Sequence, residues 1–168
     1  SIPMGQKAYY SKTISEADVT LFAGITGDSQ PLSTNAEFAA ATSAGRCAVQ
    51  SELLASYTWP VSTEIASPGA VTIDQELTFY KPVYVGDTIT VVGEVTRKVF
   101  EKKYVYVRTT VYNQNDEMVA DGYVRELMQV HGKEAEHDGN ELSSQNTACG
   151  RFCAVSQNSE RIGCDTVC

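Results

Sequence analysis

The chain has 168 residues, a formal net charge of −8, 42% hydrophobic residues and 20% charged residues. This length and composition fit one globular domain with room for a tail. The acidic balance disfavours nucleic acid as a partner, because a surface that follows phosphates needs clustered Lys and Arg. No run approaches the roughly 20 apolar residues of a membrane span, and the N-terminus lacks a signal-peptide pattern. We expect a cytoplasmic protein with no membrane contact, and an organellar location such as the peroxisome stays open.

Helical signals fill the first third of the chain after a first strand over residues 6–13. Ser15 followed by Asp18 forms a capping-box pattern, which predicts a helix start. Gly27 predicts the end of that helix. The helix should bury four apolar residues at helical spacing: Val19, Leu21, Phe22 and Ile25. Asn35 then predicts the cap of a second, short helix.

A longer helix is predicted over residues 46–59. One face of this segment carries its larger side chains: Leu53, Leu54 and Tyr57. Pro60 is expected to end the helix, because proline lacks an N–H group and clashes with the preceding turn. Residues 67–69, Ser-Pro-Gly, predict a turn.

From residue 70 the apolar period changes to two, which is typical of strands. Four runs carry it: residues 71–79, 89–95, 104–112 and 118–130. A turn-rich cluster at residues 113–116 predicts a hairpin between the last two. The fold class is therefore α+β, an antiparallel sheet with one face covered by helix. A small barrel is the competing architecture.

The last part of the chain differs in composition from the rest. Residues 131–140 are polar and lack either period, so we divide the chain into a domain over 1–130 and a linker and tail over 131–168. His131 and His137 are expected to be solvated. The tail repeats one cysteine spacing at Cys149, Cys153, Cys164 and Cys168. Disulfides are favoured slightly over a zinc site or a non-essential appendage.

Four groups of residues resemble the MaoC-like hydratases and dehydratases, which include the (R)-specific enoyl-CoA hydratases. They are Lys12-Thr13-Ile14-Ser15-Glu16-Ala17-Asp18-Val19; Phe22-Ala23-Gly24-Ile25-Thr26-Gly27-Asp28 with Pro31-Leu32; Phe79-Tyr80-Lys81-Pro82-Val83-Tyr84-Val85-Gly86-Asp87-Thr88; and Val111-Tyr112-Asn113-Gln114 with Gly122-Tyr123. The resemblance covers residues 6 to about 130. It implies a hot-dog fold, in which an antiparallel sheet wraps around a long central helix. It also implies a homodimer with the site near the subunit interface.

The family's catalytic turn normally reads Asp-x-Asn-Pro-Leu-His. Here Asp28 keeps the acid, Gln30 replaces the Asn and Ser33 replaces the His. In the family, acid and imidazole together hold and deprotonate the water that adds to an enoyl thioester. Removal of a positioned acid or base typically slows a reaction ~100- to 10,000-fold, so we expect standard enoyl-CoA hydration to be lost. A lone carboxylate in an apolar pocket can still transfer protons, because burial raises the pKa of such a group.

The family's second motif, Ala-His-Gly-Met, aligns with residues 49–52, which places Gln50 at the His and Ser51 at the Gly. In the family the Gly backbone N–H holds the thioester carbonyl, and Ser51 could keep that donor. Trp59 stands where the hydratases have a small polar residue and should narrow the pocket. Each residue also has a structural reading: Asp28 as a turn acid, Ser33 as a helix cap, Gln50 and Ser51 as a helix start, and Trp59 as a core aromatic.

We favour a lyase with a repurposed site, a dehydratase or cyclase acting on an acyl or polyketide-type intermediate of a biosynthetic pathway. Asp28 would be the general acid and base, with Ser33 and Gln50 as polar positioning groups. The groups that would bind the small-molecule substrate, for which an acyl thioester is a candidate, are Gln30, Gln50, Ser51 and Trp59. We expect no cofactor and no metal. A catalytically silent acyl-binding or structural subunit and a hot-dog thioesterase remain as alternatives.

Overall fold

The computed structural model describes residues 2–129 of the chain. The chain divides into two units, Ser1–His131 and Gly132–Cys168. The predictions for the linker, for His131 and His137 and for the four tail cysteines lie outside the described residues.

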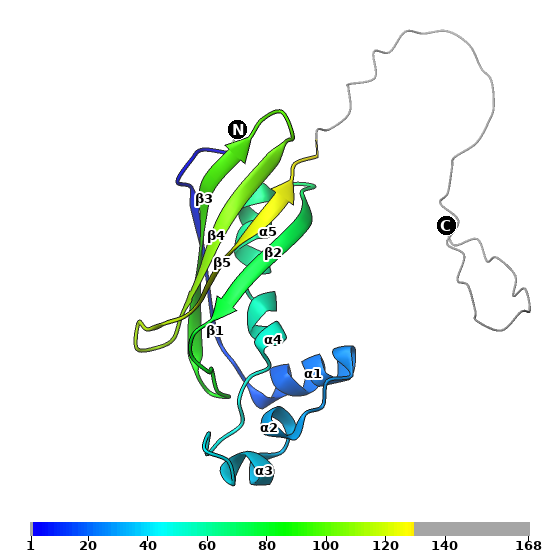
Figure 1. Cartoon of the computed structure of the whole chain (residues 1–168), viewed down its shortest axis with the longest axis vertical. Helices are drawn as coiled ribbons and strands as arrows, with labels where there is room; N and C mark the ends of the chain where they lie inside the picture. Colours follow the sequence, from blue (N-terminus) through cyan, green and yellow to red (C-terminus); the bar gives the residue numbers. More distant parts are fainter. Residues whose placement is uncertain (1, 130–168) are drawn as a thin grey trace, which may run out of the picture. The chain divides into compact units, whose positions relative to one another are not determined.

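Five strands form one antiparallel sheet in the order β1-β3-β4-β5-β2 (Figure 1). Their bounds are β1 Lys7–Thr13, β2 Val71–Phe79, β3 Thr88–Val99, β4 Tyr104–Tyr112 and β5 Met118–Leu127. The period-two runs therefore predicted the strands correctly, although β5 ends at Leu127 and not at residue 130. The two edges of the sheet are β1 and β2, and the fold is the expected α+β hot-dog type.

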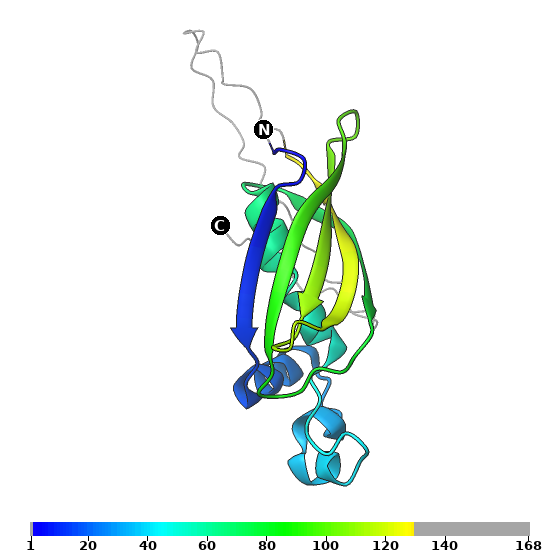
Figure 2. The same cartoon turned by 90° about the vertical axis from the view of Figure 1, so that its left-hand side faces the viewer.

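Two short helices, α4 (Ser51–Ser56) and α5 (Trp59–Ala66), lie against one face of this sheet. Three others, α1 (Glu16–Thr26), α2 (Pro31–Thr34) and α3 (Ala36–Ala40), gather beyond the end of the sheet (Figures 1 and 2). The capping box at the start of α1 is confirmed, because the Ser15 N–H donates to Asp18 Oδ2 at 2.8 Å. These bonds hold the pKa of the Asp18 carboxyl below its usual value. The left-handed Gly27, with φ of 80°, ends α1 as expected.

The prediction of one helix over residues 46–59 is wrong. The helical segment begins at Ser51, breaks at Tyr57 and Thr58, and resumes as α5. Pro60 lies in the first turn of α5, where a proline loses no hydrogen bond because the first amides of a helix have no intrahelical acceptor. The buried Thr58 hydroxyl supports the break by donating to the Ala55 carbonyl at 2.7 Å and accepting from Gln75 Nε2 of β2 at 2.7 Å.

The core lies between α5 and the sheet. Val61 and Ile65 of α5 are buried, and a Cβ built on Gly93 of β3 would lie 2.9 Å from Val61 Cγ2. Gly93 thus lets the helix approach the strand closely.

Only part of the predicted apolar face of α1 joins the core: Val19 is buried and Phe22 packs partly, while Leu21 and Ile25 are exposed. That part of the prediction is wrong, because helical spacing identifies a face but not how much of it is covered.

Candidate functional site

A cavity of about 370 Å³ lies between α2, the start of α4 and the connection from β2 to β3. Among the predicted site residues it brings together Gln30, Ser33 and Ser51. Apolar side chains contribute much of the remaining wall: Leu32, Ala48, Val49, Leu54, Phe79, Pro82 and Val83. Small-molecule sites are commonly mainly apolar with a few polar groups that fix orientation.

An extended segment holds the two walls of this cavity together. The Ala48 N–H donates to the Leu32 carbonyl at 3.2 Å, and the Val49 N–H donates to the Val83 carbonyl at 2.8 Å. Residues 48 and 49 therefore hydrogen-bond to α2 on one side and to the β2–β3 connection on the other. Distant parts of the sequence form one recess for this reason.

Ser33 lies inside the recess. Its side chain lines the cavity, and the residue is only 4% exposed. The reading of Ser33 as the cap of the next helix is wrong, because Asn35 Oδ1 accepts from the Phe38 N–H at 3.0 Å and is itself the cap of α3. The hydroxyl of Ser33 is thus in a position to contact a bound molecule.

Asp28 lies on the turn between α1 and α2 and is exposed. Its Oδ1 accepts from the Gln30 N–H at 3.3 Å, and its own N–H donates to Thr26 Oγ1 at 3.2 Å. Asp28 is not among the residues that line the cavity, so the expected burial of the acid is not found within the described chain. Its carboxylate is oriented by the backbone of Gln30, which does line the cavity. The turn role and a catalytic role are both compatible with these bonds.

Gln50 lies behind the cavity wall and is 2% exposed. Its Nε2 donates to the Val19 carbonyl at 3.3 Å, which ties the start of α4 to α1. Its Oε1 is buried and has no hydrogen-bond partner among residues 2–129. Ser51, in contrast, is exposed, lines the cavity and is the first residue of α4, so its N–H has no intrahelical acceptor.

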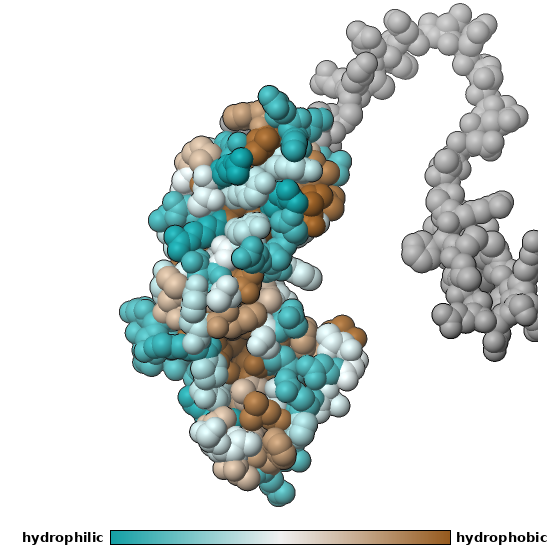
Figure 3. All heavy atoms as spheres, in the orientation of Figure 1, coloured by the Kyte–Doolittle hydropathy of each residue, from teal (hydrophilic) through white to brown (hydrophobic). Residues whose placement is uncertain are grey.

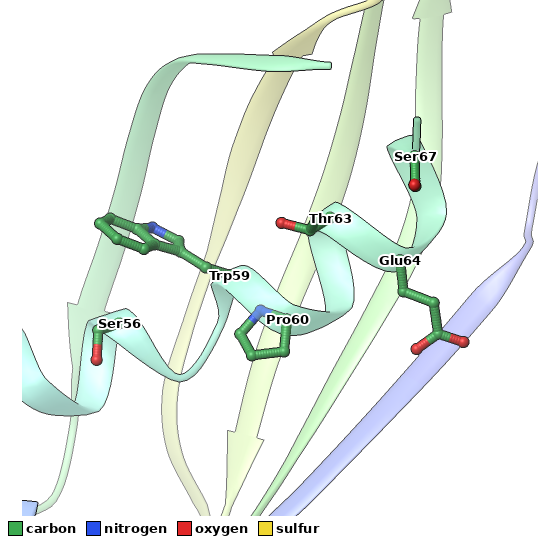
Figure 4. A pocket seen from close by; sticks show the side chains of 6 residues that line it. All are labelled: Ser56, Trp59, Pro60, Thr63, Glu64 and Ser67. Carbon is green, nitrogen blue, oxygen red and sulfur yellow. The ribbon is translucent and has the colours of Figure 1, made fainter. Parts of the chain in front are cut away.

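Trp59 lines a different cavity, of about 660 Å³, on the outer side of α5. Its indole extends toward β2, where Nε1–H donates to Gln75 Oε1 at 3.0 Å, while Glu64 points away from it (Figure 4). Trp59 is 54% exposed, so it is not a core aromatic, and it does not narrow the cavity that holds Ser33. The helix break between α4 and α5 therefore lies between Ser51, which lines the Ser33 cavity, and Trp59, which lines the other cavity.

The wall of the Ser33 cavity includes one cation, Lys81, a feature that the sequence reasoning missed. Lys81, which lines the cavity, lies 2.6 Å from Glu117 and lowers the pKa of that carboxyl. Arg46 stacks on the Tyr84 ring at 4.1 Å and lies 3.8 Å from Asp87. The cation in the cavity wall is therefore paired with an acid of the described chain.

Within residues 2–129, no three His, Cys, Asp or Glu side chains lie close enough together to hold a metal ion. None of the helices in that range has the length and apolar character needed to cross a membrane.

Comparison with known proteins gives consistent sequence matches. A family model described as a MaoC like domain matches residues 2–115. An (R)-specific enoyl-CoA hydratase of Rhodospirillum rubrum is 41% identical over 110 residues, covering 65% of this chain and 76% of that protein. A 3-hydroxyacyl-[acyl-carrier-protein] dehydratase of Solanum lycopersicum is 30% identical over 123 residues, covering 72% of this chain and 74% of that protein.

The structural comparison agrees with the sequence matches. The (R)-hydratase of Aeromonas caviae superposes with a TM-score of 0.74 at 32% identity, over 77% of this chain and 98% of that one. In sequence, an (R)-specific enoyl-CoA hydratase of the same organism is 33% identical over 123 residues, covering 73% of this chain and 92% of that protein.

Gln50 provides a test of the packing behind the cavity. Gln50→Glu would place a carboxylate oxygen against the Val19 carbonyl, so we expect the free energy of unfolding at pH 7 to fall by about 2 kcal/mol or more. Burial raises the folded-state pKa of the new carboxyl. The loss should therefore be complete above that pKa and vanish below the unfolded value of about 4.3.

Urea unfolding at several pH values measures this effect. Gln50→Leu is the matched control, because it removes the unpaired oxygen and should change stability by less than about 1 kcal/mol. Equal stability of Gln50→Glu and the parent protein at pH 7 would contradict the buried position.

Proposed function

Because the chain belongs to the family of MaoC-like domains, we propose that it is a lyase with an altered site, a dehydratase or cyclase that acts on an acyl or polyketide-type intermediate in a biosynthetic pathway. The observation that carries the proposal is the cavity at the catalytic turn, with the buried Ser33 in its wall and the acid Asp28 two residues from Gln30 at its edge. Relatives that act on acyl thioesters support a thioester substrate.

The chemistry required of Asp28 is the transfer of a proton from the α carbon to the oxygen that leaves the β carbon. In the dehydration of a 3-hydroxyacyl thioester, the carboxylate takes the proton from the α carbon, and the electrons of that C–H bond form the C=C bond. The C–O bond at the β carbon breaks, and the proton carried by Asp28 joins the leaving hydroxide as water. One carboxylate thus completes the step as base and then acid.

Two polar groups would position the substrate for this step. The Ser33 hydroxyl donates to the leaving oxygen, and Ser51 presents its side chain and first-turn N–H to the thioester carbonyl. Gln30 contributes an amide at the edge of the cavity, and Gln50 acts from behind the wall by fixing α4 to α1. Gln50 is therefore a positioning residue in this proposal.

We also propose that the protein is a homodimer joined through β2. This edge strand exposes apolar side chains, namely Val71, Ile73 and Phe79, and an unpaired edge is a ready template for a further strand. Antiparallel pairing of two β2 strands would continue the sheet across both subunits. It would also bring the cavity beside Trp59 to the subunit interface, as expected for a substrate-binding role of Trp59.

A catalytically silent acyl-binding subunit is the second candidate, because the imidazole is replaced by Ser33 and Asp28 is exposed in the single chain. A thioesterase is the third. The three differ in what an assay records: loss of water from a hydroxyacyl thioester or ring closure for the lyase, free thiol for the thioesterase, and binding alone for the silent subunit.

Asp28→Asn tests the lyase proposal. The amide cannot take up the α proton, so we expect dehydration of a 3-hydroxyacyl thioester to slow by about 100- to 10,000-fold, with unchanged thermal stability. Absorbance of the enoyl thioester measures the product, and a thiol reagent in a parallel assay detects hydrolysis.

Glu37→Gln is the matched control, since Glu37 is an exposed acid on the neighbouring α3 and should leave the rate unchanged. Full activity of Asp28→Asn would refute the role of the acid. Thiol release that depends on Asp28 would instead favour the thioesterase.

A charged substitution on β2 tests whether the dimer forms through this strand. Ile73→Asp should shift the protein toward the monomer in analytical ultracentrifugation, because it would replace an exposed apolar side chain of the shared edge with a carboxylate. Tyr9→Asp places the same charge on the exposed β1 edge and should leave the assembly unchanged. A dimer that survives Ile73→Asp but not Tyr9→Asp would move the interface to β1.

A further inference from the structure

Basic residues gather at the turn between β3 and β4, which we call the basic hairpin and define as residues 97–103. It holds four Lys or Arg and one acid, Glu101. Elsewhere in residues 2–129 there are six Lys or Arg against fourteen Asp or Glu. The basic hairpin therefore has a charge opposite to that of the remaining described surface.

Within residues 2–129, the six cations outside the basic hairpin all have an acidic partner. Each forms an ion pair: Lys7 with Glu94, Lys12 with Asp18, Arg46 with Asp87, Lys81 with Glu117, Arg108 with Asp121, and Arg125 with Asp74. In the basic hairpin, Arg97 stacks on Tyr106 at 5.3 Å, and none of the four cations pairs with an acid of the described chain. Among the described residues, no ion pair therefore neutralises the charge of the basic hairpin.

An apolar recess lies directly beside these lysines. It measures about 480 Å³, is lined by Val99, Phe100 and Met128 among others, and has Lys98 and Lys103 in its wall. Phe100 at the tip is 84% exposed. Figure 3 shows hydrophilic and hydrophobic side chains next to one another at this end of the molecule. Lysines around an apolar recess suit an acidic protein surface with an apolar side chain at its centre.

The chemistry favours a compact protein over an extended anionic surface. A lipid bilayer or a nucleic acid would also meet the acidic remainder of the chain, whose charge repels it. A small acidic protein can contact the basic hairpin alone. Among thioester carriers, an acyl carrier protein has this character, whereas a coenzyme A substrate would need cations for its phosphates at the cavity, where Lys81 is already paired with Glu117.

The strand register determines at which end of the sheet the basic hairpin lies. Tyr104 of β4 pairs with Leu127, which pairs with Val71 at the start of β2, so the basic hairpin and the start of β2 lie at one end of the sheet. Phe79, which lines the Ser33 cavity, lies at the other end of β2. Antiparallel pairing of two β2 strands would bring the start of one beside the end of the other. The basic hairpin of one subunit would then lie toward the cavity of its partner.

We propose that the basic hairpin and its apolar recess form the docking surface for an acidic acyl carrier protein, which delivers its acyl thioester to the Ser33 cavity of the partner subunit. This inference rests on the proposed function for the identity of the cargo. The docking itself depends only on the charge and shape of the basic hairpin.

Charge reversal at the hairpin tests the proposal. The probe is a free-standing bacterial acyl carrier protein loaded with a 3-hydroxybutyryl chain, compared with the same chain on coenzyme A. For Lys102→Glu/Lys103→Glu we expect kcat/KM with the carrier-bound substrate to fall about tenfold or more, and with the coenzyme A substrate to change less than twofold. Lys7→Glu, a reversal on β1, is the matched control and should affect neither.

Binding of the loaded carrier, followed by NMR shifts of labelled carrier protein, separates docking from chemistry. Binding that is lost in the double variant, without turnover by the parent protein, would support the docking surface and overturn the lyase function. Equal carrier binding by both proteins, or an equal loss with both substrates, would overturn the docking surface. Adsorption to phosphatidylserine vesicles through the basic hairpin without carrier binding would also overturn it.

Discussion

The close approach of α5 to β3 is the contact on which the remaining architecture depends. Because position 93 has no side chain, the buried Val61 and Ile65 reach the sheet, and the helix axis is fixed against the strand. The bond from Gln75 to Thr58 then sets where α5 begins. With α5 fixed, α4 is directed toward the far end of the sheet, where its first residue meets the catalytic turn.

Much of the fold could be predicted from local pattern, because the determining interactions are local. Alternation defined the strands, and Ser15 and Asp18 defined the start of α1 through bonds three residues apart. The helix break could not be predicted in this way. A proline in the interior of a helix breaks it, whereas a proline in the first turn is tolerated. Which of these applies to Pro60 depends on where α5 begins. The bond from Gln75, on a strand that follows later in the chain, sets that start.

The candidate site was only partly predictable for a similar reason. The motif located the turn, and Ser33 indeed lines a cavity. Exposure of Asp28, burial of Gln50 and the separate position of Trp59 depend on how elements far apart in sequence meet. The basic hairpin was not identified from the sequence. It stands out only in the structure, where the six other cations of residues 2–129 are seen to be paired.

In the proposed function, this chain keeps the acid of a hydratase-type site, Asp28, and has Ser33 in place of the imidazole. Hydration of crotonyl-CoA by Ser33→His tests this proposal, since the new imidazole would enter the cavity that is also lined by Gln30, whose N–H bonds to the Asp28 carboxylate. We predict a gain of about 100-fold over the parent protein, absent in Ser33→Asn and lost again in Ser33→His/Asp28→Asn. A correctly folded Ser33→His protein with no gain in hydration would show that the cavity is not a hydratase-type site.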